Sequence, residues 1–148
     1  MTRTPKYIAL VAILVTACAG DDKPEPLAVV PDISVNDHMM SVVTPATDTI
    51  WGIEDPQSDA EWQVIDTAAV DIIAAFEAMK LGGSGENDIA WAANEDWDAM
   101  MDEAIEAALL ARAAVLNRDV DGVLAAGNVL YPPCENCHLK YHPGVAGQ

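Results

Sequence analysis

Basic side chains are scarce in this chain of 148 residues, which has seven lysines and arginines against 24 aspartates and glutamates. The formal charge is −17, and removal of residues 1–17 would take away Arg3 and Lys6 but no acidic residue. So acidic a surface argues against nucleic acid and anionic lipid headgroups as partners, since both carry negative charge. It favours instead a partner protein that has a basic docking patch.

Long apolar runs are also lacking, because the N-terminal run at residues 7–15 is too short to cross a bilayer and remain there. Since Arg3 and Lys6 precede this run, we predict that residues 1–17 are an export signal. The run leads into LVTAC at residues 14–18, which resembles the lipobox of bacterial lipoproteins, where the new N-terminal cysteine is acylated. Cys18 is then a lipid anchor. The alternative is an ordinary small-residue cleavage site that releases a soluble periplasmic protein.

Residues 18–32 are rich in acidic residues and proline, among them Asp21, Asp22 and Pro24. This composition is typical of a connecting segment without regular structure. We therefore predict a lipidated, flexible acidic linker. It would hold one domain, residues 33–148, away from the membrane.

Strand patterns are absent from Ile33 onward, where the apolar residues follow a helical period. Ser34 with Asp37, and Ser58 with Glu61, have the spacing of N-terminal capping boxes. Four helices joined by short connections favour an all-α fold, an antiparallel four-helix bundle with its cofactor between facing helices. The predicted helices cover residues 34–51, 58–81, 94–115 and 119–138, with Trp51, Trp62 and Trp97 in the core.

The fourth predicted helix contains Pro132 and Pro133, which lack amide donors and clash with the preceding turn. We expect the helix to kink or restart there, with Pro133 in the first turn of a short helix. Its core face is predicted from three-four spacing. The residues at this spacing are Leu124, Gly127, Tyr131, Cys134 and His138.

Three of the last fifteen residues, Cys134, Cys137 and His138, form a C-x-x-C-H motif, which is typical of c-type haem attachment. Its two thiols can be joined to the haem vinyl groups, and the histidine can bind the iron. In bacteria this attachment takes place outside the cytoplasmic membrane, so the motif and the export signal support each other. With Cys18 lipidated, no cysteine remains for a structural disulfide.

Two other uses of this motif are open. A dithiol oxidoreductase also uses C-x-x-C, but such a site belongs to a βαβ unit, and nothing here indicates strands. A zinc site could combine Cys134, Cys137, His138 and His142. Coordination by the adjacent Cys137 and His138 would crowd a tetrahedral site, which disfavours zinc.

The helical pattern, the segment 39–51 (MMSVVTPATDTIW) and the terminal C-x-x-C-H-x-x-Y together resemble the cytochrome c′ superfamily, in particular its low-spin members with His/Met ligation. The resemblance covers about residues 33–143. It implies one covalent haem c, with Cys134 and Cys137 as thioether residues and His138 as the proximal iron ligand. In that family the first helix presents the sixth iron ligand or an apolar residue that blocks its position. Met39 is the candidate distal ligand by this resemblance.

Helical spacing independently places Met39 on a face with Val42, Val43, Ala46 and Ile50. Met40 lies about 100° further round a helix of 3.6 residues per turn. A methionine in such a stripe often only fills a core, so a site without a distal protein ligand stays open. His38, which lies on a different face, is a further candidate.

A histidine and a thioether together favour low-spin iron and raise its reduction potential. We therefore expect a monohaem electron carrier, tethered at the periplasmic face of a bacterial membrane, rather than an enzyme. A peroxidase would need a polar distal pocket, and no histidine or arginine shares the Met39 face. The alternative is a gas-binding haem protein for CO or NO with an open or displaceable sixth position. Lys140 could pair with a haem propionate, and a homodimer through the first two helices stays open.

Overall fold

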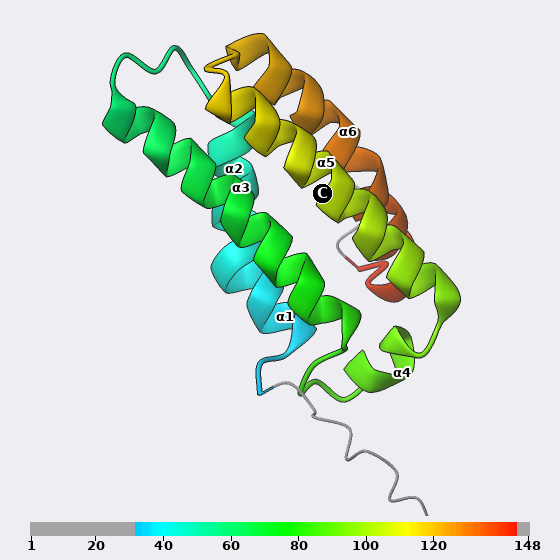
Figure 1. Ribbon diagram of the computed structural model, residues 1–148. Coiled ribbons are helices and arrows are strands. Elements are labelled where there is room, and N and C mark those ends of the chain that lie inside the picture. Colours follow the sequence, from blue (N-terminus) through cyan, green and yellow to red (C-terminus); the bar gives the residue numbers. More distant parts are fainter. Residues whose placement is uncertain (1–31, 145–148) are drawn as a thin grey trace, which may run out of the picture.

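The computed structural model describes residues 32–144 (Figure 1). Within that range all regular elements are helices and none is a strand, which confirms the all-α prediction. The predicted signal peptide, Cys18 and residues 18–31 of the predicted linker lie outside the described residues. Among the helices of the described range, none is long and apolar enough to cross a membrane. In chain order the elements are α1 (Val35–His38), the π-helical turn η1 (Met39–Val43), α2 (Thr44–Trp51), α3 (Asp59–Lys80), α4 (Asp88–Ala92), α5 (Glu95–Leu116) and α6 (Val120–Tyr141).

Side-chain caps begin two of the helices where the sequence predicts them. At α1, Ser34 Oγ accepts a hydrogen bond from the Asp37 amide at 3.0 Å. At α3, Ser58 Oγ accepts from the Glu61 amide at 3.3 Å, and the Glu61 carboxylate accepts from the Ser58 amide at 2.8 Å. The hydrogen bond from the Ser58 hydroxyl, followed by those from backbone amides, lowers the pKa of Glu61. These caps satisfy amides that a helix start leaves unpaired.

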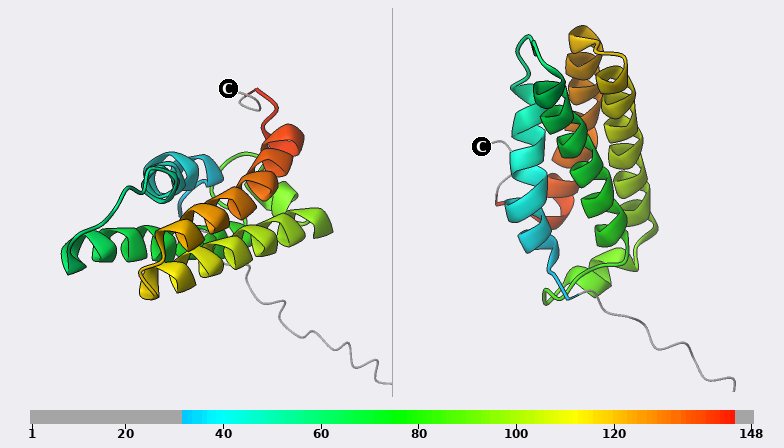
Figure 2. Two further views of the ribbon diagram at one scale, coloured as in Figure 1. Left: turned by 90° about the horizontal axis from the view of Figure 1, so that it is seen from above. Right: turned by 60° about the vertical axis from the view of Figure 1, so that its left-hand side comes forward.

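Elements α1, η1 and α2 follow one another without a break and form the first helical stretch. It lies side by side with α3, α5 and α6, and successive members of this set run in opposite directions (Figures 1 and 2). Contacts close them into a ring, because α2 packs on α3 and α6 while α5 packs on the same two helices. Apolar side chains fill the space that this ring encloses. The largest fully buried side chains are Ile50, Ile72, Phe76, Met79, Trp97, Met101, Val123 and Leu130.

The contact between α2 and α6 depends on Gly127. Trp51 Nε1 donates a hydrogen bond to the Gly127 carbonyl at 3.0 Å. A Cβ atom at Gly127 would lie only 2.8 Å from Trp51 Cδ1, so the indole could not approach a larger residue this closely. Trp51 is nevertheless 41% exposed, which corrects its predicted place in the core. The indole lies at the edge of the α2–α6 contact, where one side still meets water.

The predicted first helix is interrupted by the π-helical turn η1. The Thr44 amide donates to the Met39 carbonyl, five residues earlier, instead of to the carbonyl four residues earlier. Pro45 follows directly and has no amide hydrogen for the Ser41 carbonyl, and its ring would clash with that carbonyl in an α-helix. A wider turn removes the clash. Proline therefore accounts for a feature that spacing alone does not reveal.

Helix α6 corrects two predictions. It does not restart at Pro133 but continues through both prolines. The carbonyls that the prolines leave without donors belong to Asn128 and Val129, whose exposed positions let water take the donors' place.

The core face of α6 also lies one residue earlier than predicted. Leu124 and Tyr131 are 38% and 52% exposed, whereas Val123 and Leu130 are completely buried. The prediction was aligned on Cys134 and His138, which lie at the margin of the buried face. Gly127 and Cys134 keep their predicted inward position.

A buried carboxylate fixes the start of α1 to the connection between α3 and α5. Asp88, on the short helix α4 that was not predicted, is only 4% exposed. Its Oδ2 accepts hydrogen bonds from the amides of Val35 and Gly85, each at 2.9 Å. Gly83 leaves room for this arrangement, because a Cβ there would lie 2.4 Å from Asp88 Oδ2 and 2.9 Å from the Val35 nitrogen.

Substitution of Gly83 by alanine should therefore destabilise the fold. The added methyl group must push apart a carboxylate and a backbone segment, and we expect the free energy of unfolding to fall by about 1–3 kcal/mol. Urea unfolding followed by circular dichroism measures this loss. Ser84→Ala, at the exposed neighbouring position, is the matched control and should change stability little. Equal stability of the two variants would contradict this account of the connection.

Candidate functional site

Helix α6 carries the three residues of the C-x-x-C-H motif on one face. Positions three and four apart lie over one another on an α-helix, which brings Cys134, Cys137 and His138 together. Cys137 is buried, while Cys134 and His138 are partly buried. Neither cysteine is in a disulfide. Two thiols and an imidazole thus meet one side of a cavity from a single rigid element.

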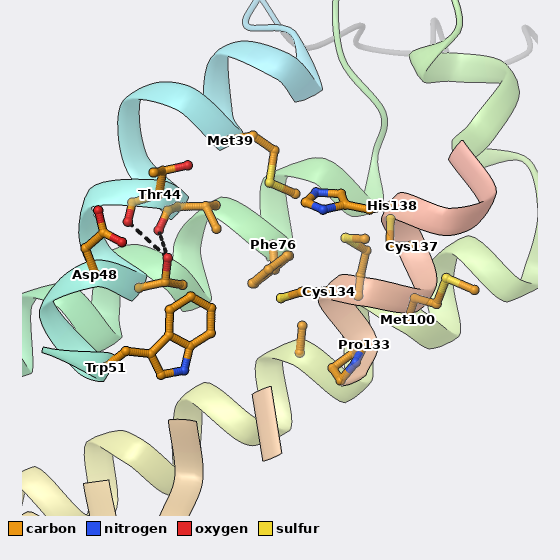
Figure 3. A pocket seen from close by; sticks show the side chains of 14 residues that line it. Met39, Thr44, Asp48, Trp51, Phe76, Met100, Pro133, Cys134, Cys137 and His138 are labelled. Carbon is orange, nitrogen blue, oxygen red and sulfur yellow. Dashed lines mark hydrogen bonds between the residues drawn. The ribbon is translucent and has the colours of Figure 1, made fainter. Parts of the chain in front are cut away.

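That cavity has a volume of about 180 Å³ and lies between α6, α5, α3 and the first helical stretch (Figure 3). Its walls are mostly apolar. The polar Thr47 hydroxyl is turned to its own helix, since Oγ1 lies 2.9 Å from the Val43 carbonyl and 3.0 Å from that of Thr44. The lining residues are Met39, Val43, Thr44, Thr47, Asp48, Trp51, Phe76, Met100, Met101, Ala104, Pro133, Cys134, Cys137 and His138.

Met39 and His138 point toward each other from opposite sides of the cavity (Figure 3). Met39 comes from η1 and His138 from α6. Met40, by contrast, is 67% exposed. A thioether side chain and an imidazole ring therefore face one another. His38 lines neither this cavity nor the one beside it.

A second cavity, of about 420 Å³, adjoins the first and shares Met39, Thr44, Cys137 and His138 with it. Three aromatic rings bound it, with centroids 5.7 Å apart for Trp91 and Trp97 and 5.0 Å apart for Trp97 and Tyr141. The first cavity alone is smaller than the roughly 300–1,000 Å³ of typical small-molecule sites, and the second is within that range. The facing pair Met39 and His138 thus lies where the two hollows meet.

Burial controls the protonation of the motif. It raises the pKa of Cys134 to about 12, with a further contribution from Cys137, and the pKa of Cys137 to about 11. Burial lowers the pKa of His138, and the charge of the nearby His142 lowers it further. Each shift favours the neutral form, because a charged group loses hydration in this setting. At neutral pH the site therefore presents two protonated thiols and an uncharged imidazole.

Lys140, which could pair with a haem propionate, forms an ion pair with Asp96. Its Nζ also lies 5.2 Å from the centre of the Tyr141 ring. Tyr141 donates a hydrogen bond to the Asp96 carboxylate at 3.1 Å. This cluster fastens the end of α6 to the start of α5, beside the second cavity.

The residues suit some cofactors better than others. Two thiols, one histidine and a facing methionine are a chemically appropriate set for a covalently attached haem. Zinc would need four convergent ligands, and between residues 32 and 144 no three His, Cys, Asp or Glu side chains are grouped to hold a metal ion. His142 lines the second cavity but is not part of such a group.

Several lining residues were not assigned to the site from the sequence. Phe76, Met101 and Ala104 belong to the predicted apolar stripes, so only their proximity to α6 was missing. Met100 and Asp48 carry no local signal that distinguishes them from surface residues. Three-dimensional packing alone brings these five side chains to one hollow.

No protein-family model, no curated protein and no solved structure matches this chain.

The raised thiol pKa values predict slow alkylation of the folded, haem-free chain. At pH 8 iodoacetamide should modify Cys134 and Cys137 much more slowly in buffer than in urea, where thiols recover a pKa of about 8.5. Because the pKa is raised, the reactive thiolate should increase in the folded chain only as the pH approaches about 11. Mass spectrometry of timed samples measures both rates. Equal rates with and without urea at pH 8 would contradict the buried, protonated state.

Proposed function

We propose that this chain is a monohaem c-type cytochrome that carries single electrons outside the cytoplasmic membrane. One observation carries the proposal. Met39 and His138 face each other across a mostly apolar cavity whose wall also contains both cysteines of a C-x-x-C-H motif. On this proposal the helices form an antiparallel four-helix bundle around the haem, as in the low-spin members of the cytochrome c′ superfamily.

Each group of the site has a definite task in this function. Cys134 and Cys137 would hold the haem through thioether bonds, His138 would be the proximal ligand, and Met39 the distal one. A bound haem supplies one-electron exchange between ferrous and ferric iron. The neutral imidazole keeps its nitrogen lone pair available, and the thioether has no proton to lose. Neither axial residue therefore needs to gain or release a proton during electron exchange.

The surroundings support electron transfer more than catalysis. Apolar side chains limit the entry of water, and the Thr47 hydroxyl is bonded within its helix. No arginine lines the first cavity among the described residues, and its only histidine is the proximal candidate. A peroxidase needs distal groups that donate and accept protons. We infer that the protein is not an enzyme and that its acidic surface docks a redox partner with a basic patch.

A dithiol oxidoreductase is the weaker reading of the same residues. Its attacking cysteine must be a thiolate, and such enzymes lower that pKa. Burial here raises the pKa of both Cys134 and Cys137. The thiols of this site are therefore suited to attachment during maturation more than to rapid thiol exchange.

The visible absorption spectrum tests the proposal directly. Chain produced with c-type haem maturation machinery should, when reduced, give a low-spin spectrum that carbon monoxide does not change. Met39→Leu should give a high-spin spectrum that shifts on addition of carbon monoxide, because the sixth position loses its sulfur. Met100→Leu is the matched control, since Met100 lines the cavity but points away from His138 (Figure 3).

The other outcomes separate the alternatives. No haem band would contradict the proposed function. A carbon monoxide shift in the unaltered protein would favour a gas-binding haem protein with a displaceable sixth position. If Met100→Leu also loses the low-spin spectrum, the spectral change does not identify Met39 as the distal ligand.

Localisation belongs to the same proposal. We propose that Cys18 is acylated and anchors the protein at the periplasmic face of a membrane, with residues 18–32 as a linker. The predicted export signal, the LVTAC sequence and the location of haem attachment in bacteria all support this position.

Replacement of Cys18 by serine should therefore release the protein. We expect the wild-type chain in the membrane fraction and the Cys18→Ser chain in the soluble periplasmic fraction, with the same haem spectrum. Immunoblots of fractionated cells measure the distribution. A wild-type protein that is already soluble would support ordinary signal cleavage without a lipid.

A further inference from the structure

Two adjacent methionines differ sharply in their surroundings. Met39 lines both cavities and points toward His138, whereas Met40 borders only the second cavity and is 67% exposed. Both are thioethers on the same stretch of chain. The backbone conformation must therefore determine which of the two side chains faces the cavity.

A regular helix would turn the other methionine inward. The cavity face of α2 is marked by Thr44, Thr47, Asp48 and Trp51. Extension of that face toward the N-terminus at about 100° per residue places Met40 about 30° from its centre. By the same α-helical geometry, Met39 would lie about 130° from the centre.

The turn η1 supplies the difference. In it the Thr44 amide reaches back five residues to the Met39 carbonyl, so this turn contains one residue more than an α-helical turn. Because of this additional residue, the residue that faces the cavity on the N-terminal side of the turn is one position earlier in the sequence. Residues N-terminal to the turn therefore lie in a different phase from α2, and Met39 takes the place that Met40 would have.

We propose that Pro45 selects Met39 over Met40 by imposing this π-helical turn. Pro45 offers no amide hydrogen to the Ser41 carbonyl and cannot approach it in an α-helix, so the chain widens there. Pro45 is a positioning residue, since it does not line the first cavity and acts through the backbone. That the selected sulfur serves iron rests on the proposed function, whereas the choice between the two side chains does not.

Regular helical spacing alone does not explain why Met39 faces the cavity. Regular helical spacing groups it with Val42, Val43, Ala46 and Ile50. Of these, Val43 lines the first cavity, whereas Ala46 and Ile50 are buried and do not line it. In the structure the cavity face of α2 is a different one, and Met39 reaches it only through the change of phase in η1. Spacing thus predicts Met39 at the cavity, whereas the change of phase in η1 explains how it reaches this position.

Two variants test the selection without haem. In the full haem-free chain, hydrogen peroxide should oxidise exposed Met40 several-fold faster than Met39, as peptide mass spectrometry can measure. In Pro45→Ala the α-helical turn is permitted, and we expect the order to reverse or the rates to become comparable. Deletion of Val42 in the Pro45→Ala background removes the additional residue and should restore protection of Met39. Pro56→Ala, in the connection between α2 and α3, is the matched control and should behave as wild type.

Spectra of the haem-loaded protein give the second readout. With Pro45 present, Met39→Leu should abolish the low-spin spectrum and Met40→Leu should not. In the Pro45→Ala background the low-spin spectrum should depend on Met40 instead. A spectrum that depends on Met39 equally in both backgrounds, or oxidation rates that Pro45→Ala leaves unchanged, would overturn the selection by Pro45. If Met39→Leu leaves the low-spin spectrum unchanged while Pro45 is present, this result would instead contradict Met39 as the distal ligand.

Discussion

The spacing of Cys134, Cys137 and His138 on one continuous helix is the constraint on which the rest of the site depends. Because the three residues share a face of α6, every other wall of the cavity must come from elements packed against that face. Helices α3 and α5 supply apolar walls, and the first helical stretch supplies the side opposite His138. The exposed positions of Pro132 and the carbonyls before it allow α6 to continue despite two prolines.

Local signals in the sequence were sufficient for the long helices and for one half of the site. The capping residues Ser34 and Ser58 mark true helix starts, because a cap depends on neighbours a few residues away. The C-x-x-C-H residues come together for the same reason, as helical spacing brings them to one face. Met39 was also predicted to face the site, and the structure places it opposite His138.

What could not be predicted depends on contacts between distant segments. Asp88 is buried where it accepts a hydrogen bond from the distant Val35 amide. No local pattern marks α4 as the element that provides this carboxylate. The predicted core face of α6 is displaced by one residue, because Cys134 and His138 of the motif lie at the margin of the buried face. The π-helical turn follows from Pro45, yet spacing rules that assume 3.6 residues per turn pass over it.

The Asp88 contact has a consequence for the order in which the site can assemble. Helices α5 and α6 are joined by a short turn and pack extensively along each other, so the part of the chain that carries the two thiols is local in sequence. The start of the first helical stretch instead depends on a hydrogen bond between residues 53 positions apart. Contacts that close long loops form later and at greater entropic cost than local ones. The thiol-bearing half of the cavity can thus be in place while the methionine-bearing half is still open, which would give the proposed haem a way in before the last wall closes.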